Sequence, residues 1–358
     1  MLRFREMSNE QRRQFVDVGQ TFTAWREASK QFGHSYEGSY RAGMRWVKRN
    51  GADYLLRKYR KTERSLGPRS PETEKIQEKY MRERSRIRRR LTQTKARLDS
   101  MRRVNVALRL NRVPIEAAKV IRALDEADLL GRHVFVVGTN AMYAYEARAG
   151  ILFGVDRIST QDLDVLLDAR RRLTLAFSDD VRCEGIMGIL RKADKTYDTG
   201  RMYGYSATND DGYIVDLICP EEGPVLSAPS KRLGEDFNDL EPAPIEGLQW
   251  LINAPKIEEI AIGEDGMPLH LACIDPRVFA LHKKWLSLQV TRQPIKKKRD
   301  AEQAVAVAAL CQSYFNLGFD TKELSALPSS IRDLRKELSE QAAGFLEVED
   351  SDIDQRGW

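Results

Sequence analysis

The sequence predicts an α+β protein, in which a mixed-sheet core lies between an N-terminal helical and β-hairpin extension and a C-terminal helical part. Apolar residues recur at helical spacing toward both ends, and short apolar runs bounded by Gly and Asn fill the middle. The 358 residues leave room for more than one domain. We expect the extension over 1–112, the core over 113–240, short strands and helices over 241–340, and an acidic, disordered tail over 341–358.

Composition narrows the class of protein. No apolar run approaches the ~20 residues needed to span a bilayer. The N-terminal residues lack the apolar stretch of a secretory signal. The four cysteines are scattered, with no CxxC pair. We therefore expect a cytoplasmic protein with reduced thiols, no structural zinc and no membrane partner.

The extension is predicted to begin with a helix and a hairpin. Residues 8–32 carry apolar side chains at helical spacing. Asn50-Gly51 is a strong two-residue turn signal between two partly alternating runs, which predicts a β-hairpin.

A long basic helix is expected next. GPRSPETE (67–74) predicts a loop that enters the helix through Ser70 as N-cap and Pro71 at the first helical position. The chain then has neither Gly nor Pro to about Leu110. Six arginines stand within residues 81–90, from Arg82 to Arg90. Such a run either attracts a phosphate backbone or forms a solvated, salt-bridged helix face, and dimerisation through this helix is compatible with both.

The core is predicted from alternating helix and strand signals. A helix closed by Gly131 precedes the strand HVFVVG, and a short helix follows it. After residue 240 we expect short strands and then helices from Pro276 to about Leu338. The expected helices are 114–131 and 140–150, and the expected strands are 162–167, 201–207, 212–220, 248–252, 257–262 and 268–273.

Three aspartates of the predicted core lie within apolar runs. Asp162 and Asp164 stand two apart in the apolar run DLDVLL, and residues two apart in a strand point to the same side. Either the strand begins at Asp164 and both acids are solvated, or a cation lies between them. Asp216 lies inside the apolar run YIVDLI, where it is either a metal ligand or an edge-strand acid. Three carboxylates on adjacent strands are able to share one or two Mg²⁺ or Mn²⁺ ions.

A glycine turn precedes the acids. In VVGTN, Gly138 allows the backbone to approach a ligand closely, and the following helix offers free N–H groups to phosphate. Thr139 adds a hydroxyl. The chain has no GxxxxGK[ST] loop and no GxGxxG after a strand, which disfavours other phosphate-binding classes.

In this order, the glycine turn, the acid–x–acid strand and the later single acid resemble the polymerase-β-like nucleotidyltransferase superfamily. The resemblance implies the nucleotidyltransferase fold for the core. It implies Asp162, Asp164 and Asp216 as catalytic metal ligands, and Gly138-Thr139-Asn140 as the nucleotide-binding turn. Thr139 departs from the small Gly or Ser that is usual there.

Two segments are similar to abortive-infection-type nucleotidyltransferase toxins. RISTQDLDVLL (157–167) matches their acid strand, and DPRVFALHKKWLSLQVTRQPIKKKRD (275–300) matches a helical Lys…Arg…Lys-Asp segment, in which Asp300 would orient a cation. For Arg157, pairing with Asp168 is the alternative. The resemblance implies nucleotide-binding roles for Arg157, Lys283, Lys284, Arg292 and Lys298.

Residues from about 40 to 315 also resemble a bacterial nucleotidyltransferase-fold family that shares the GMRWVKRNGADYLLR…SLGPRSPETE extension. The resemblances imply metal-dependent transfer of a nucleoside monophosphate from an NTP, such as ATP, to a hydroxyl. RNA is the favoured acceptor, held by the basic helix, with a protein or small molecule as alternatives. A toxin or defence role with a partner antitoxin is compatible, as is a homo-oligomer. The alternative function is an inactive regulator of this fold that binds nucleotide or RNA.

Overall fold

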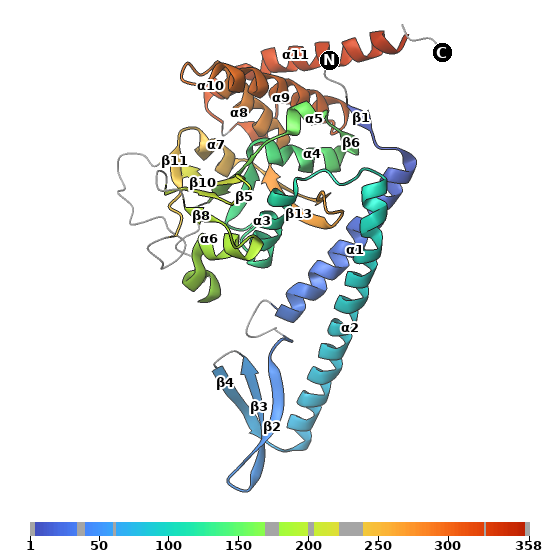
Figure 1. Ribbon diagram of the computed structural model, residues 1–358, viewed down its shortest axis with the longest axis vertical. Helices are drawn as coiled ribbons and strands as arrows, with labels where there is room; N and C mark the ends of the chain where they lie inside the picture. The colour runs from blue at the N-terminus through green and yellow to red at the C-terminus, as the bar shows by residue number, and fades with distance from the viewer. Residues whose placement is uncertain are drawn as a thin grey trace. The chain divides into compact units, whose positions relative to one another are not determined.

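The computed structural model describes residues 4–33, 40–59, 62–168, 179–199, 204–221, 239–325 and 327–354 (Figure 1). The chain divides into two compact units. Unit 1 comprises residues 1–9, 111–264 and 269–358, and unit 2 comprises residues 10–110 and 265–268. Helices and a mixed sheet occur together in unit 1, which confirms the α+β class. None of the helices in the described ranges has the length and apolar character needed to cross a membrane.

The sheet of unit 1 has eight strands in the order β12-β13-β5-β7-β10-β9-β8, with β11 beside β10. It is mixed, because β7 pairs parallel to β10 and antiparallel to β5. The strands are β5 Val134–Val137, β7 Asp162–Leu167, β8 Asp198–Thr199, β9 Ser206–Thr208, β10 Ile214–Pro220, β11 Ala243–Ile245, β12 Lys256–Ile262 and β13 Pro268–Ile274. A separate two-stranded pair joins β1 Arg5–Glu6 to β6 Ile151–Leu152.

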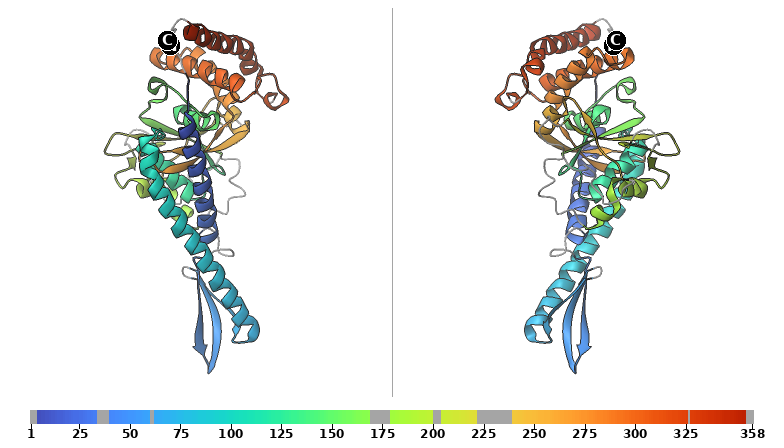
Figure 2. Two further views of the ribbon diagram at one scale, coloured as in Figure 1. Left: turned by 90° about the vertical axis from the view of Figure 1, so that its right-hand side faces the viewer. Right: turned by 90° about the vertical axis from the view of Figure 1, so that its left-hand side faces the viewer.

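Helices cover both faces of this sheet. In the views of Figures 1 and 2, α3 and α6 lie on one side, and α8, α9 and α11 lie on the other. The apolar face of α3, with Val120, Ile121 and Leu124, is fully buried. The helical segments are α3 Ile115–Glu126, η1 Gly138–Ala141, α4 Met142–Ala149, α5 Val155–Ile158, α6 Asp179–Ala193, α7 Leu248–Asn253, α8 Pro276–Leu288, α9 Pro294–Ser313, η3 Lys322–Leu324, α10 Ser329–Arg332 and α11 Leu334–Asp354.

Unit 2 consists of two helices and a three-stranded antiparallel sheet: α1 Asn9–Gly33, β2 Gly43–Arg49, β3 Ala52–Tyr59, β4 Thr62–Pro68 and α2 Pro71–Ala107. The predicted hairpin is present, since β2 pairs with β3 through Asn50 and Gly51, both at positive φ. Near the end of α2, Gln14 Nε2 of α1 donates to Asn105 Oδ1 at 2.8 Å. Leu55, Leu56 and Ile87 are buried within this unit.

Four expectations differ from the structure. LQWLI forms helix α7 instead of a strand, because Leu248, Leu251 and Ile252 bury one helical face at i, i+3, i+4 spacing. The start of GPRSPETE belongs to β4, which pairs with β3 through Pro68. Helix α11 covers residues 341–354 of the expected disordered tail, and residues 355–358 lie outside the described residues. The expected helix 114–131 stops at Glu126, and residues 201–203 of an expected strand lie outside the described residues.

Candidate active site

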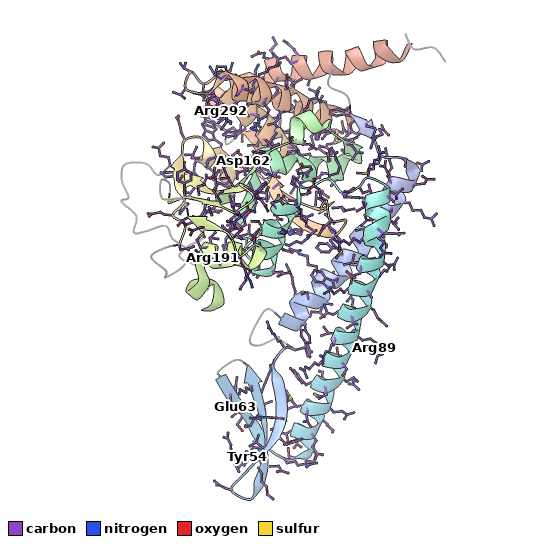
Figure 3. All side chains as sticks on the ribbon, viewed as in Figure 1. Tyr54, Glu63, Arg89, Asp162, Arg191 and Arg292 are labelled. Atoms are coloured by element: carbon purple, nitrogen blue, oxygen red, sulfur yellow. The ribbon has the colours of Figure 1, made fainter. Side chains whose placement is uncertain are left out.

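Two neighbouring strands bring the three aspartates onto one face of the sheet. Strand β7 begins at Asp162, so both acids of the pair lie within the strand. Asp164 is the register partner of Asp216 across the parallel β7–β10 pair. Residues directly opposite in a ladder point to the same side, so the carboxylates of Asp162, Asp164 and Asp216 share a face. Asp162 is labelled in Figure 3, in the centre of unit 1.

Gly138 is required beside these acids for steric reasons. Its φ is +63°, and a Cβ built on it would lie 2.2 Å from Asp164 Oδ2. The preceding residue, Val137, is the register partner of Asp164 on the other side of β7. A side chain at position 138 would therefore displace the Asp164 carboxylate.

The residues after Gly138 hold the turn in place. Asn140 Nδ2 donates to the carbonyl oxygen of Asp162 at 2.7 Å. Thr139 Oγ1 accepts from Gln303 Nε2 of α9 at 3.2 Å. The Thr160 hydroxyl donates to the Asp162 carboxylate. Thr139 and Asn140 are both buried, so their side chains connect the turn to β7 and α9.

The acidic group is electrostatically crowded. Burial, followed by the charge of Asp162, raises the pKa of Asp164 to about 7, whereas Lys283 acts in the opposite direction. Burial is also the main cause that raises the pKa of Asp216, against a hydrogen bond from Ser206. Negative charge at this site is therefore unfavourable unless a cation lies nearby.

A buried acid fixes two cations near the aspartates. Lys283 Nζ of α8 lies 2.7 Å from Asp300 Oδ1, and Arg292 lies 2.8 Å from Asp300 Oδ2. Burial lowers the pKa of Lys283, although Asp300 opposes this shift. For Asp300 itself burial would raise the pKa, but the charges of Lys283 and Arg292 hold it below its ordinary value. Asp300 thus orients both cations, where the sequence predicted that it would orient one.

Lys284 does not reach the site. Its Nζ lies 2.8 Å from Glu337 and 3.2 Å from Gln341 Oε1, both on α11. Successive residues of a helix are rotated by about 100°, so Lys283 and Lys284 point in different directions. The structure therefore places Lys283 close enough to Asp164 to act on its pKa, whereas Lys284 pairs with α11 and its nucleotide-binding role stays a prediction.

By the same argument, Lys298 lies on a different face of α9 from Lys296 and Asp300. Asp300 and Gln303 are buried, and residues 296, 300 and 303 share one helix face by their spacing. Lys296 acts to lower the pKa of Asp216, whereas Lys298 is exposed on another face. Lys296 therefore lies near the acidic group in addition to Lys283 and Arg292, and the i, i+4, i+7 spacing was the signal that identifies Lys296 and Gln303. The nucleotide-binding role of Lys298 stays a prediction.

Arg157 is buried on α5, and its carbonyl oxygen accepts from Gln303 Nε2 at 2.7 Å. Its backbone therefore belongs to the support of the turn that carries Thr139. The predicted contact between its guanidinium and a phosphate stays a prediction.

The acids fit a hard divalent ion by donor type. Within the described residues, no three His, Cys, Asp or Glu groups already converge closely enough to hold a metal. Asp162, Asp164 and Asp216 nevertheless offer only carboxylate oxygens, the donors that Mg²⁺ and Mn²⁺ prefer. The crowding that raises the pKa of Asp164 is the kind of repulsion that such an ion would offset.

Comparison with known proteins gives one match. A family model described as a nucleotidyltransferase matches residues 116–328, which include the glycine turn, all three aspartates and the cations of α8 and α9. No curated protein and no solved structure matches the chain.

Proposed function

The chain belongs to this nucleotidyltransferase family, and from that premise we propose that it transfers a nucleoside monophosphate from an NTP to a hydroxyl of RNA. The observation that carries the proposal is the register of β7 and β10, which sets Asp164 opposite Asp216 and beside Gly138, where a side chain would displace the Asp164 carboxylate. Asp162, Asp164 and Asp216 are the acids that we assign to catalysis.

In this reaction the acceptor oxygen forms a bond to the α-phosphorus. The bond from that phosphorus to the oxygen bridging the β-phosphate breaks, and pyrophosphate leaves. The proton of the hydroxyl passes to a carboxylate of the acidic group. Lys283 and Arg292, fixed by Asp300, together with Lys296, supply positive charge for the triphosphate.

We assign Asp162, Asp164 and Asp216 as ligands of Mg²⁺ or Mn²⁺. When bound, such an ion neutralises phosphate charge and increases the acidity of the acceptor hydroxyl. The protein holds the carboxylates on adjacent strands, and the glycine at position 138 leaves room for the Asp164 carboxylate. The likeness to abortive-infection-type toxins supports a defence role controlled by a partner antitoxin.

The experiment that tests this proposal is incubation with each α-³²P-labelled NTP, Mg²⁺ or Mn²⁺, and total bacterial RNA. We expect label in RNA with wild type and with Asp320→Asn, whose carboxylate is 95% exposed and paired with Arg335. We expect none with Asp162→Asn or Asp164→Asn. Label on the protein itself would replace RNA by a protein hydroxyl as acceptor.

Nucleotide binding without transfer by wild type would overturn the enzymatic proposal in favour of a regulator. Transfer that persists in both aspartate variants would remove these acids from the reaction.

A further inference from the structure

The positive charge of the chain is concentrated in one segment. Residues 40–110 contain 23 Lys and Arg but only seven Asp and Glu, a net charge of +16, whereas the whole chain has +6. The remaining residues therefore carry a net negative charge. Most of residues 40–110 lie in α2 and the sheet of unit 2.

Helix α2 has one buried face and one basic face. Tyr80, Ile87, Leu98 and Asn105 are buried, at spacings of seven or eleven residues that place them on the same side. The opposite side carries Lys75, Arg82, Arg89 and Arg103, each exposed and separated by multiples of seven residues, or about 10 Å for each step of seven. Figure 3 shows Arg89 on this helix.

Several of the arginines in residues 82–90 of α2 lack an acidic partner. Arg86 pairs with Glu83 at 2.8 Å, and Arg90 pairs with Glu27 at 3.3 Å. Arg82, Arg88 and Arg89 make no ion pair or side-chain hydrogen bond with any residue in the described ranges. Unpaired like charges on neighbouring turns repel one another, so this face is suited to an external polyanion.

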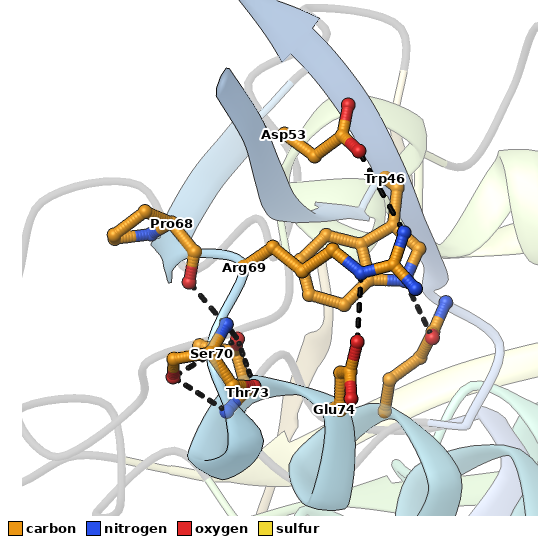
Figure 4. A network of polar contacts seen from close by, with 8 residues as sticks. Trp46, Asp53, Pro68, Arg69, Ser70, Thr73 and Glu74 are labelled. Carbon is orange, nitrogen blue, oxygen red and sulfur yellow. Dashed lines mark hydrogen bonds and ion pairs between the residues drawn. The ribbon is translucent and has the colours of Figure 1, made fainter.

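The start of α2 is fixed firmly to the sheet of unit 2 (Figure 4). The Ser70 hydroxyl accepts from Thr73 N at 3.3 Å, and Thr73 Oγ1 accepts from Ser70 N at 2.9 Å. The Arg69 guanidinium lies 2.7 Å from Glu74 and over the ring of Trp46, 5.4 Å from its centroid. The basic face is consequently held at a set spacing within unit 2, which lowers the entropy cost of binding an extended, rigid ligand.

We infer that the outer face of α2 binds the phosphate backbone of a double-helical stretch of RNA. This inference rests on the proposed function, because it names how the acceptor RNA is held. A single strand would require aromatic platforms for its bases, but the only aromatic residue of α2, Tyr80, is buried. Regularly spaced guanidinia without such platforms match the phosphates of a duplex.

The test is fluorescence anisotropy of the full-length protein with a labelled RNA hairpin in the absence of NTP, over a range of salt concentrations. Arg82→Gln/Arg88→Gln/Arg89→Gln removes three unpaired charges and retains good helix formers. Arg132→Gln/Arg191→Gln/Arg335→Gln is the matched control, because it removes the same charge from arginines of unit 1 that are each paired with an acid.

We expect the α2 variant to weaken hairpin binding at least tenfold and to reduce the slope of log K against log salt by about 2–3. The control variant should change binding less than threefold. Circular dichroism verifies that both variants remain folded.

Equal losses in the two variants would overturn the inference and leave only a general charge effect. Tighter binding of an unpaired strand of the same length, or of a DNA duplex, would overturn double-helical RNA as the ligand and identify that strand or duplex instead. Because no NTP is present, loss of transfer in the labelling experiment would leave the binding result intact, so the two proposals fail separately.

Discussion

Asp164 occupies a position where its charged form is unfavourable. It is partly buried, lies against Gly138 and shares a face with two further carboxylates. Such a position is costly for stability and suits a residue that acts on a charged ligand, since the repulsion disappears when a cation binds. At the scale of single residues, the site is therefore recognisable by carboxylates that repel one another unless a cation is bound.

We expect Asp164→Asn to stabilise the protein while abolishing transfer. The unfolded chain ionises this carboxyl near pH 4 and the folded protein near pH 7, so wild type loses stability between these values and no further above them. Three pKa units correspond to about 4 kcal/mol, so the variant should exceed wild type in Tm by several degrees at pH 8 and by little at pH 4. Calorimetry at both values checks this, and an unchanged or lower Tm at pH 8 would contradict it. Added Mg²⁺ should raise the Tm of wild type alone.

Asp300→Asn is expected to destabilise the protein, in contrast to Asp164→Asn. The Asp300 side chain is fully buried and is the ion-pair partner of the buried Lys283. Removing its charge leaves an ammonium in the interior without a counterion, which costs about 3 kcal/mol. The same change should weaken NTP binding, because Arg292 loses its anchor. Urea unfolding and calorimetry of NTP binding measure the two effects. Asp320→Asn is the control, and its exposed ion pair should contribute less than about 1 kcal/mol.

Among the elements, strands were easier to predict than the directions of helical side chains. The run DLDVLL and the turn at Gly138 could be placed from the sequence, because apolar alternation and glycine have local causes. Which lysine of α8 faces the sheet depends on a rotation of 100° per residue and on where α11 packs. The sequence therefore predicted both Lys283 and Lys284, although only the first lies beside Asp300.

Short elements are also hard to predict from the sequence. Five residues such as LQWLI suit a strand or a helix equally, and the surrounding packing decides. Capping signals are local, so Ser70 and Pro71 were placed correctly at the start of α2. The third strand β4 was missed because its last residues, Gly67 and Pro68, are typical of a loop.

The cap of α2 provides a prediction at this scale. Ser70→Ala removes the hydroxyl that accepts from Thr73 N and should cost about 1 kcal/mol of the stability of unit 2. Ser85→Ala, at an exposed position inside the same helix, should have no destabilising effect, because Ala has the higher helix propensity. Thermal unfolding followed by circular dichroism distinguishes them. Equal Tm values for wild type and Ser70→Ala would show that this cap does not stabilise the helix.

Across the whole molecule, the two units divide both the core and the charge. Every residue of the main apolar core cluster belongs to unit 1, whereas unit 2 buries its own set around Leu55, Leu56 and Ile87. The proposed catalytic residues all lie in unit 1, and the proposed RNA-binding face lies in unit 2. Chemistry and acceptor binding would thus depend on separately stabilised parts of one chain.

Separate cores predict two unfolding transitions in scanning calorimetry. Saturating NTP with Mg²⁺, at about 100 times its Kd, should stabilise unit 1 by about 2.7 kcal/mol and raise its Tm by roughly 5–10 °C. The other transition should stay in place with the nucleotide and move down in Ser70→Ala, because that cap belongs to unit 2. Asp164→Asn provides the control, since its unit 1 transition should no longer respond to Mg²⁺. A single transition that shifts as a whole with nucleotide and with Ser70→Ala would mean that the two cores unfold as one.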